Sequence, residues 1–248
     1  MINHMRVLTT LLLAFAILDS ASEPAYAMHI SEGILPAHWA ALWFALAIPF
    51  VAWGLRNLRI RSKEEPYLKA LVGLVGAAVF VISCMPIPVP TAGTCSHPCG
   101  TGMAAILIGP TLTVVVASIA LVLQALFLAH GGLTTLGADI LSMGVIGAFA
   151  GYGVFVLARR LGAPWVVAAF LAGLLSDWAV YAATSFFLAA ALHGDGSLTG
   201  MFLAIGVAFV PTQVPLGILE GFLSAGCYSF VHTRRPEFLG MLNRGGAL

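Results

Sequence analysis

Two histidines in this chain stand where their surroundings could make them metal ligands, and the first is His29. Ala25 and Ala27 form an A-x-A cleavage site behind the apolar run 7–18, which is the layout of a secretory signal. Cleavage after Ala27 would leave Met28-His29 as a free N-terminus. The α-amine of Met28, the amide nitrogen of His29 and the His29 ring could then chelate one metal ion in fused rings.

The second histidine, His97, lies in the segment 86–102, whose many prolines and glycines predict an ordered loop rather than a helix. His97 could add a fourth nitrogen to an ion already held by the N-terminus. Four nitrogens, one of them a deprotonated amide, favour Ni²⁺, Cu²⁺ or low-spin Co²⁺ in a square-planar or tetragonal site. Mg²⁺ and Ca²⁺ prefer oxygen ligands and are disfavoured.

Four further polar residues are candidates for supporting this site without binding the ion themselves. Glu32 and Ser96 stand close in sequence to the proposed ligands. His130 and Asp139 flank an outer turn, where they could orient His97 or the N-terminal segment, or could simply cap helices.

Cys95 and Cys99 bracket His97 and leave three alternatives open. They could supply thiolate ligands, form a disulfide on the oxidising side of the membrane, or pack in the interior. A structural or redox role is favoured over direct ligation, because thiolates suit Zn²⁺ or Cu⁺ better than a nitrogen-rich site does.

The composition identifies a polytopic membrane protein of the all-α class. The chain has 248 residues, of which 60% are hydrophobic and only 8% are charged, whereas a soluble domain carries about 25% charged residues. Its mean hydropathy is +1.00. Neither of its two lysines, Lys63 and Lys69, follows a glycine, so a phosphate-binding loop is missing and ATP hydrolysis would require another subunit. The chain also lacks an H-E-x-x-H motif, and the net charge of +1 gives no indication of nucleic-acid binding.

About seven membrane segments are expected, with residues 1–27 removed as a signal peptide and 28–248 forming one domain. Six apolar runs are long enough to cross a bilayer, and the short run 100–109 ends at Gly109-Pro110 and is expected to enter only to half depth. The six long runs are 39–55, 68–84, 111–129, 140–157, 165–192 and 201–230.

This count places the protein in the cell inner membrane, with the mature N-terminus on the outer side and the C-terminus on the inner side. Every lysine and arginine of the mature chain then lies on the inner side, as the positive-inside rule requires. The outer face gathers histidines and acidic residues instead, which predicts a mouth that attracts cations.

Asp177 and Glu220 stand inside apolar segments, where an ionisable residue is a functional candidate by default. They could form a proton or cation relay. The favoured interpretation is an interhelical hydrogen bond that fixes packing.

The stretch Met28-His-Ile-Ser-Glu-Gly-Ile-Leu-Pro36 resembles the mature start of the CbiM/NikM proteins, the substrate-binding membrane components of energy-coupling-factor transporters for cobalt and nickel. The segments 93–102 and 130–137 resemble the His-bearing loop and another segment of that family. The resemblance implies that Met28, His29 and His97 bind the ion in a square plane.

The resemblance also implies the partners and the cargo. A member of this family works with a transmembrane coupling subunit, ATPase subunits and a small accessory membrane protein, all in the lipid bilayer. The signal sequence favours cobalt uptake for cobalamin synthesis, with nickel uptake as the alternative. An intramembrane zinc metalloenzyme that uses His97, Cys95 and Cys99, and a proton-coupled carrier that uses Asp177 and Glu220, are the rival hypotheses.

The N-terminal chelate predicts that one extra residue before Met28 abolishes metal binding, because the amine becomes part of a peptide bond. The affinities of the mature and the extended protein for Co²⁺ and Ni²⁺, measured in parallel, test this. Equal affinities would rule out Met28-His29 as the chelator and leave His97 and its cysteines as the site.

Overall fold

The computed structural model describes residues 30–85, 87–89, 94–128 and 130–243. The predicted signal peptide and the candidate ligands Met28 and His29 lie outside this part of the chain, as does the side chain of Cys95.

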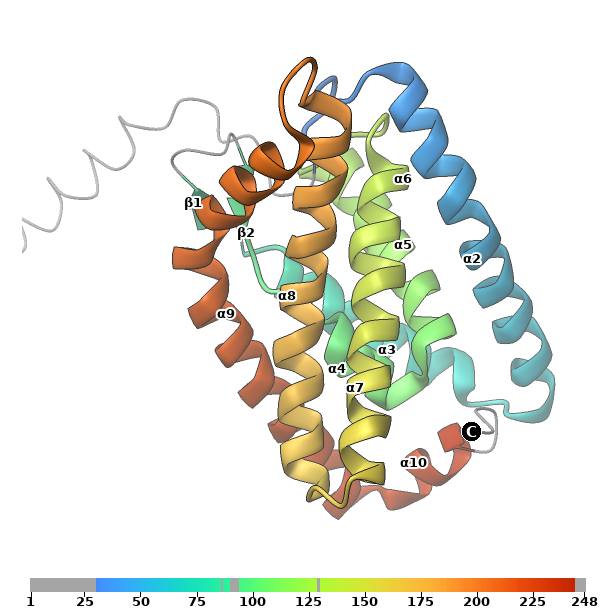
Figure 1. Cartoon of the computed structure of the whole chain (residues 1–248). Helices are drawn as coiled ribbons and strands as arrows, with labels where there is room; N and C mark the ends of the chain where they lie inside the picture. Colours follow the sequence, from blue (N-terminus) through green and yellow to red (C-terminus); the bar gives the residue numbers. More distant parts are fainter. Residues whose placement is uncertain (1–29, 86, 90–93, 129, 244–248) are drawn as a thin grey trace, which may run out of the picture.

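Long helices dominate the described structure, and they run roughly along one direction (Figure 1). In chain order the elements are α2 (Ala37–Glu64), α3 (Leu68–Ser83), β1 (Ile87–Val89), β2 (Thr94–Ser96), α4 (Thr101–Ile108), α5 (Pro110–Phe127), α6 (Leu136–Asp139), the π-helix η1 (Ile140–Gly147), α7 (Ala148–Arg160), α8 (Trp165–Leu192), α9 (Leu198–Arg234) and α10 (Pro236–Asn243).

Every predicted membrane segment corresponds to a helix. Among the described residues, five helical stretches are long and apolar enough to span a membrane, namely Ala37–Glu64, Pro110–Phe127, Leu136–Arg160, Trp165–Leu192 and Leu198–Arg234. Helix α3 has 16 residues and α4 has 8. The protein is therefore multi-pass, while the count of seven segments and the placement of the two ends remain predictions.

The expectation of a plain loop over 86–102 is wrong in part. β1 and β2 form a small antiparallel hairpin, with Ile87 opposite Ser96, so the fold is not purely helical. α4 begins at Thr101, inside the predicted loop. Prolines and glycines obscured both elements, because they lower helix and strand propensity without preventing short elements whose ends they define.

A sharp break separates α4 from α5 at the predicted position. Gly109 has a φ of +86°, a conformation that side chains disfavour, and Pro110 occupies the first turn of α5. All eight residues of α4 are buried, which agrees with a helix that is apolar on every side. α4 therefore forms the centre of the bundle.

Glycines allow α7 to approach α4 and α8 closely. A methyl group on Gly151 would lie 3.0 Å from the Cα of Gly102 in α4 and 3.0 Å from the Cβ of Ser176 in α8. One on Gly147 would lie 2.6 Å from Val180. The Gly147-x3-Gly151 face is thus used for packing within the bundle.

The two ends of the bundle carry different elements. One end, at the top of Figure 1, carries the start of the described chain, the hairpin and the turn between α8 and α9. The opposite end carries the turn after Arg159-Arg160 and helix α10. Large apolar side chains are exposed along the helices between the ends, including Leu46, Trp53 and Phe222, as contact with lipid requires.

We expect Gly151→Ala to destabilise the bundle by about 1–3 kcal/mol, because the added methyl overpacks the junction of α4, α7 and α8. Gly153→Ala is the matched control, since a Cβ there has no neighbour within 4 Å. Thermal unfolding in detergent measures the difference. Equal melting temperatures for both variants would contradict the packing assignment.

Candidate metal site

The segment that follows His29 is fixed by the turn before η1. The Ile30 backbone N–H donates to Asp139 Oδ1 at 3.0 Å, and the Thr135 hydroxyl donates to the Ile30 carbonyl. Thr134 N–H donates to Glu32 Oε2 at 3.1 Å. A hydrogen bond from the Thr134 side chain, with smaller contributions from the backbone N–H groups of Thr134 and Leu133, holds the pKa of the exposed Glu32 carboxyl below its usual value. Asp139 and Glu32 therefore connect the segment that begins at Ile30 to this turn, and the predicted role of Asp139 in orienting a metal ligand stays a prediction.

The contact between the two segments depends on a glycine. A Cβ on Gly132 would lie 2.7 Å from Glu32 Cα and 2.8 Å from its backbone nitrogen, which is closer than real side chains approach. Only a residue without a side chain lets the turn lie against the N-terminal segment.

His97 is fully buried, and its neighbours determine which ring nitrogen is available. Its backbone N–H donates to the Tyr181 hydroxyl at 3.0 Å, and that hydroxyl donates to the His97 carbonyl at 3.1 Å. The His97 Nδ1 lies 2.8 Å from the Pro98 carbonyl oxygen. Because a carbonyl can only accept, Nδ1 carries the proton, and the lone pair on Nε2 can coordinate a metal ion.

His130 lies beside His97, with ring centroids 5.1 Å apart. Burial, with a smaller contribution from His130, lowers the pKa of His97 from 6.5 to about 3. Burial also lowers the pKa of His130. The His97 ring is therefore neutral at physiological pH and needs to lose no proton to bind a cation. The turn that holds Ile30 also supplies His130, so one loop supports both halves of the predicted site.

Ser96 anchors the end of β2 to α9. Its hydroxyl lies 2.6 Å from the Thr212 hydroxyl and accepts a hydrogen bond from Gln213 Nε2 at 2.8 Å. Ser96 therefore supports His97 through the backbone, by fixing the strand from which His97 follows.

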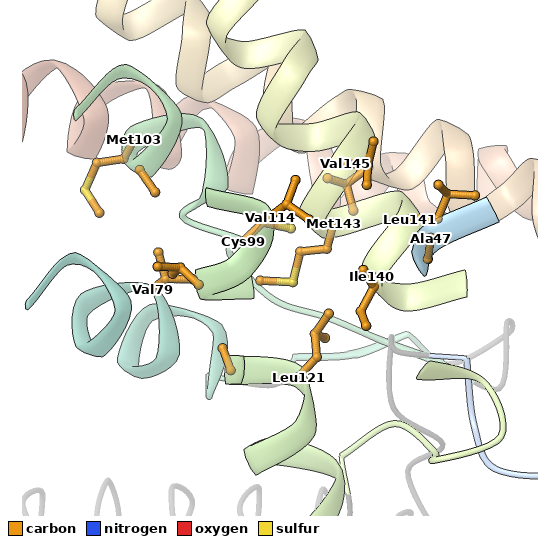
Figure 2. Close-up of a cluster of buried hydrophobic side chains, with 14 of the residues drawn as sticks. Ala47, Val79, Cys99, Met103, Val114, Leu121, Ile140, Leu141, Met143 and Val145 are labelled. Carbon is orange, nitrogen blue, oxygen red and sulfur yellow. The ribbon is translucent and has the colours of Figure 1, made fainter. Parts of the chain in front are cut away.

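Cys99 carries a free thiol, and the disulfide alternative stays a prediction because the side chain of Cys95 lies outside the described residues. Its side chain is fully buried and belongs to the apolar cluster shown in Figure 2. The thiol lies 3.9 Å from Asp177 Oδ1, to which it donates a weak hydrogen bond. The burial of Cys99 agrees with the packing alternative, and the choice between packing and ligation stays a prediction.

Glu220 holds the loop after His97 from the α9 side. It accepts hydrogen bonds from the backbone N–H of Cys99 and, at 3.1 Å, from that of Gly100. Gly100 has a φ of +68°, which favours glycine. The sequence indicated only that a carboxyl group inside an apolar segment needs a partner. The structure shows that the partner is loop backbone, and it adds Tyr181, for which the sequence carried no specific signal.

Comparison with known proteins identifies the family. Residues 29–238 match the family described as CbiM, "Cobalt uptake substrate-specific transmembrane region". The chain belongs to this family. The match covers most of the chain and includes every described residue of the candidate site.

Named relatives and solved structures agree with this assignment. The chain is 61% identical over 215 residues to "Cobalt transport protein CbiM" of Sorangium cellulosum, covering 87% of this chain and 96% of that one. It is 59% identical over 226 residues to the protein of the same name from Geobacter sulfurreducens, covering 90% of this chain and 65% of that relative. A crystal structure of a truncated transition metal transporter superposes with a TM-score of 0.73 at 25% identity, covering 83% of this chain and 99% of the other.

We expect Asp139→Ala to weaken metal capture by about 10–100-fold, as removal of a group that orients a ligand does. The mutation leaves the Ile30 N–H without its acceptor and frees the segment next to His29. Asp195→Ala, in the exposed turn between α8 and α9, is the control. Equilibrium binding of Co²⁺ measures the effect, and equal affinity of the two variants would show that Asp139 does not position the site.

Proposed function

We propose that this protein is the substrate-capturing membrane component of a cobalt importer of the energy-coupling-factor type. The family assignment and relatives that carry the name of a cobalt transport protein support this function. The protein would bind Co²⁺ on the outer side of the membrane and release it inside.

The ion is held by the α-amine of Met28, the amide and ring nitrogens of His29, and Nε2 of His97. The observation that carries this proposal is the buried His97, whose Nδ1–H donates to the Pro98 carbonyl, so that the ring carries its coordinating lone pair on Nε2. The anchoring of Ile30 by Asp139 supports it further, because Ile30 directly follows His29 in the sequence.

The four nitrogen donors explain selectivity among divalent cations, because these ions differ in the ligand atoms they prefer. Cations that prefer oxygen, such as Mg²⁺, lose their hydration shell without adequate replacement, whereas Co²⁺ gains strong imidazole and amide bonds. The amide nitrogen loses its proton on binding, so capture releases protons. Ni²⁺ suits the same donor set, and the parallel measurement proposed above separates the two ions.

We infer that ATP hydrolysis requires separate ATPase subunits, because the sequence contains no phosphate-binding loop. The resemblance to the CbiM/NikM proteins implies a coupling subunit and a small accessory membrane protein as further partners. The zinc-enzyme hypothesis receives no support from the described residues. There the Cys99 thiol groups with Asp177 and Glu220 and not with His97.

We expect His97→Ala to lower the affinity of the mature protein for Co²⁺ by at least about 10-fold, because one of four ligands is lost. His193→Ala is the matched control: this half-buried histidine bonds only the backbone carbonyls of its own helix among the described residues. Equilibrium binding, accompanied by thermal unfolding to confirm the fold, measures the change. Undiminished affinity in a folded His97→Ala protein would overturn the proposed ligand set.

A further inference from the structure

Three buried side chains from distant parts of the chain meet below the candidate site. Cys99 comes from the loop before α4, Asp177 from the middle of α8 and Glu220 from α9. One sulfur or oxygen atom from each lies within 4.8 Å of the other two. The exposed fractions are 0% for Cys99 and Asp177 and 1% for Glu220, so bulk water does not reach the group.

The two carboxyl groups have no cationic partner among the described residues. The ion pairs in that part of the chain are Arg61–Glu65 and Arg235–Glu237, both far along the sequence from the cluster. Two carboxyl groups at one buried position require a shared proton or a bound cation, because their charges repel. When no metal ion is bound, a proton shared by the two carboxyl groups removes this repulsion.

The two carboxyl groups also differ in the hydrogen bonds that they accept. Glu220 accepts two backbone N–H bonds at the start of α4, which stabilise its ionised form. Asp177 accepts the weak hydrogen bond of the Cys99 thiol through Oδ1, and no amide or hydroxyl group of the described residues donates to its Oδ2. A buried carboxylate oxygen without such a donor can accept the proton shared with Glu220 or, in its place, a cation.

We propose that Cys99, Asp177 and Glu220 form a second site for a divalent transition-metal ion. The proposal rests on the proposed function, because the ion that reaches this site is the one captured at His97. A thiolate sulfur and two carboxylate oxygens suit borderline ions such as Co²⁺ and Zn²⁺.

The position of the cluster fits an ion that moves inward. Tyr181, which bonds to the backbone of His97, lies four residues after Asp177 on α8. The two side chains therefore share a face of the helix and are separated by about 6 Å along its axis. Asp177 is nearer to the Trp165 end of α8, which follows the arginine-rich turn expected on the inner side of the membrane.

The ligand set also fits transient binding. Three protein ligands leave a fourth position open for water, in contrast to the four nitrogens of the capture site. Such a site accepts an ion and releases it more readily than the capture site does.

The test is a titration of the purified, mature, full-length protein with Co²⁺ alone. The first equivalent fills the nitrogen site, and the second is expected to produce a near-ultraviolet thiolate-to-cobalt charge-transfer band. Cys99→Ser should abolish the band. Asp177→Asn, which keeps the shape of the side chain, should lower the affinity for the second Co²⁺ ion by at least about 10-fold. The first equivalent should be unchanged in Asp177→Asn, and Asp195→Asn should behave as the parent protein does.

A parent protein without the band, or a folded Asp177→Asn protein with unchanged binding of the second equivalent, would overturn this proposal. Because the parent protein alone can give the first result, the test does not depend on the variants folding. The protein with one residue added before Met28 separates this proposal from the first. In that protein, loss of capture with the band retained supports both sites, whereas capture and the band both retained would count against the N-terminal chelate alone.

Discussion

The hydrogen bonds from the Cys99 and Gly100 backbone to Glu220 are the interaction on which the rest of the site depends. An irregular loop inside an apolar bundle leaves N–H groups that lipid cannot satisfy. The carboxylate of Glu220 on α9 accepts hydrogen bonds from two of these N–H groups at the point where α4 begins. This contact allows the loop to enter the bundle, and it fixes the depth of His97, which lies just before Cys99 and Gly100 in the sequence.

Two further constraints make the loop rigid. Tyr181 on α8 bonds to both backbone groups of His97, and Gln213 on α9 bonds to Ser96. The bundle thus presents a ring nitrogen in a fixed orientation and in neutral form, so little reorganisation accompanies binding. The N-terminal segment is anchored separately through Ile30. In the proposed site, this rigid half and the terminal half would close around the ion together.

The membrane helices could be predicted from the sequence because each is a long apolar run between charged or breaking residues. Gly109-Pro110 was enough to separate α4 from α5. The hairpin and the start of α4 at Thr101 could not be predicted, because residue pattern over so few positions carries little information. For Cys99 the sequence left ligation, disulfide and packing open, and only the three-dimensional neighbours decided that the thiol is free and buried.

The sequence by itself determined the membrane class, the apolar segments, the candidate ligands and the resemblance to a family of metal transporters, because these depend on local composition and short motifs. The tertiary structure decided which residues support them. Asp139 reaches Ile30 across 109 positions, and Glu220 reaches Cys99 across 121. Hydrogen bonds between residues so far apart arise only from the way helices pack, and local pattern does not encode helix packing.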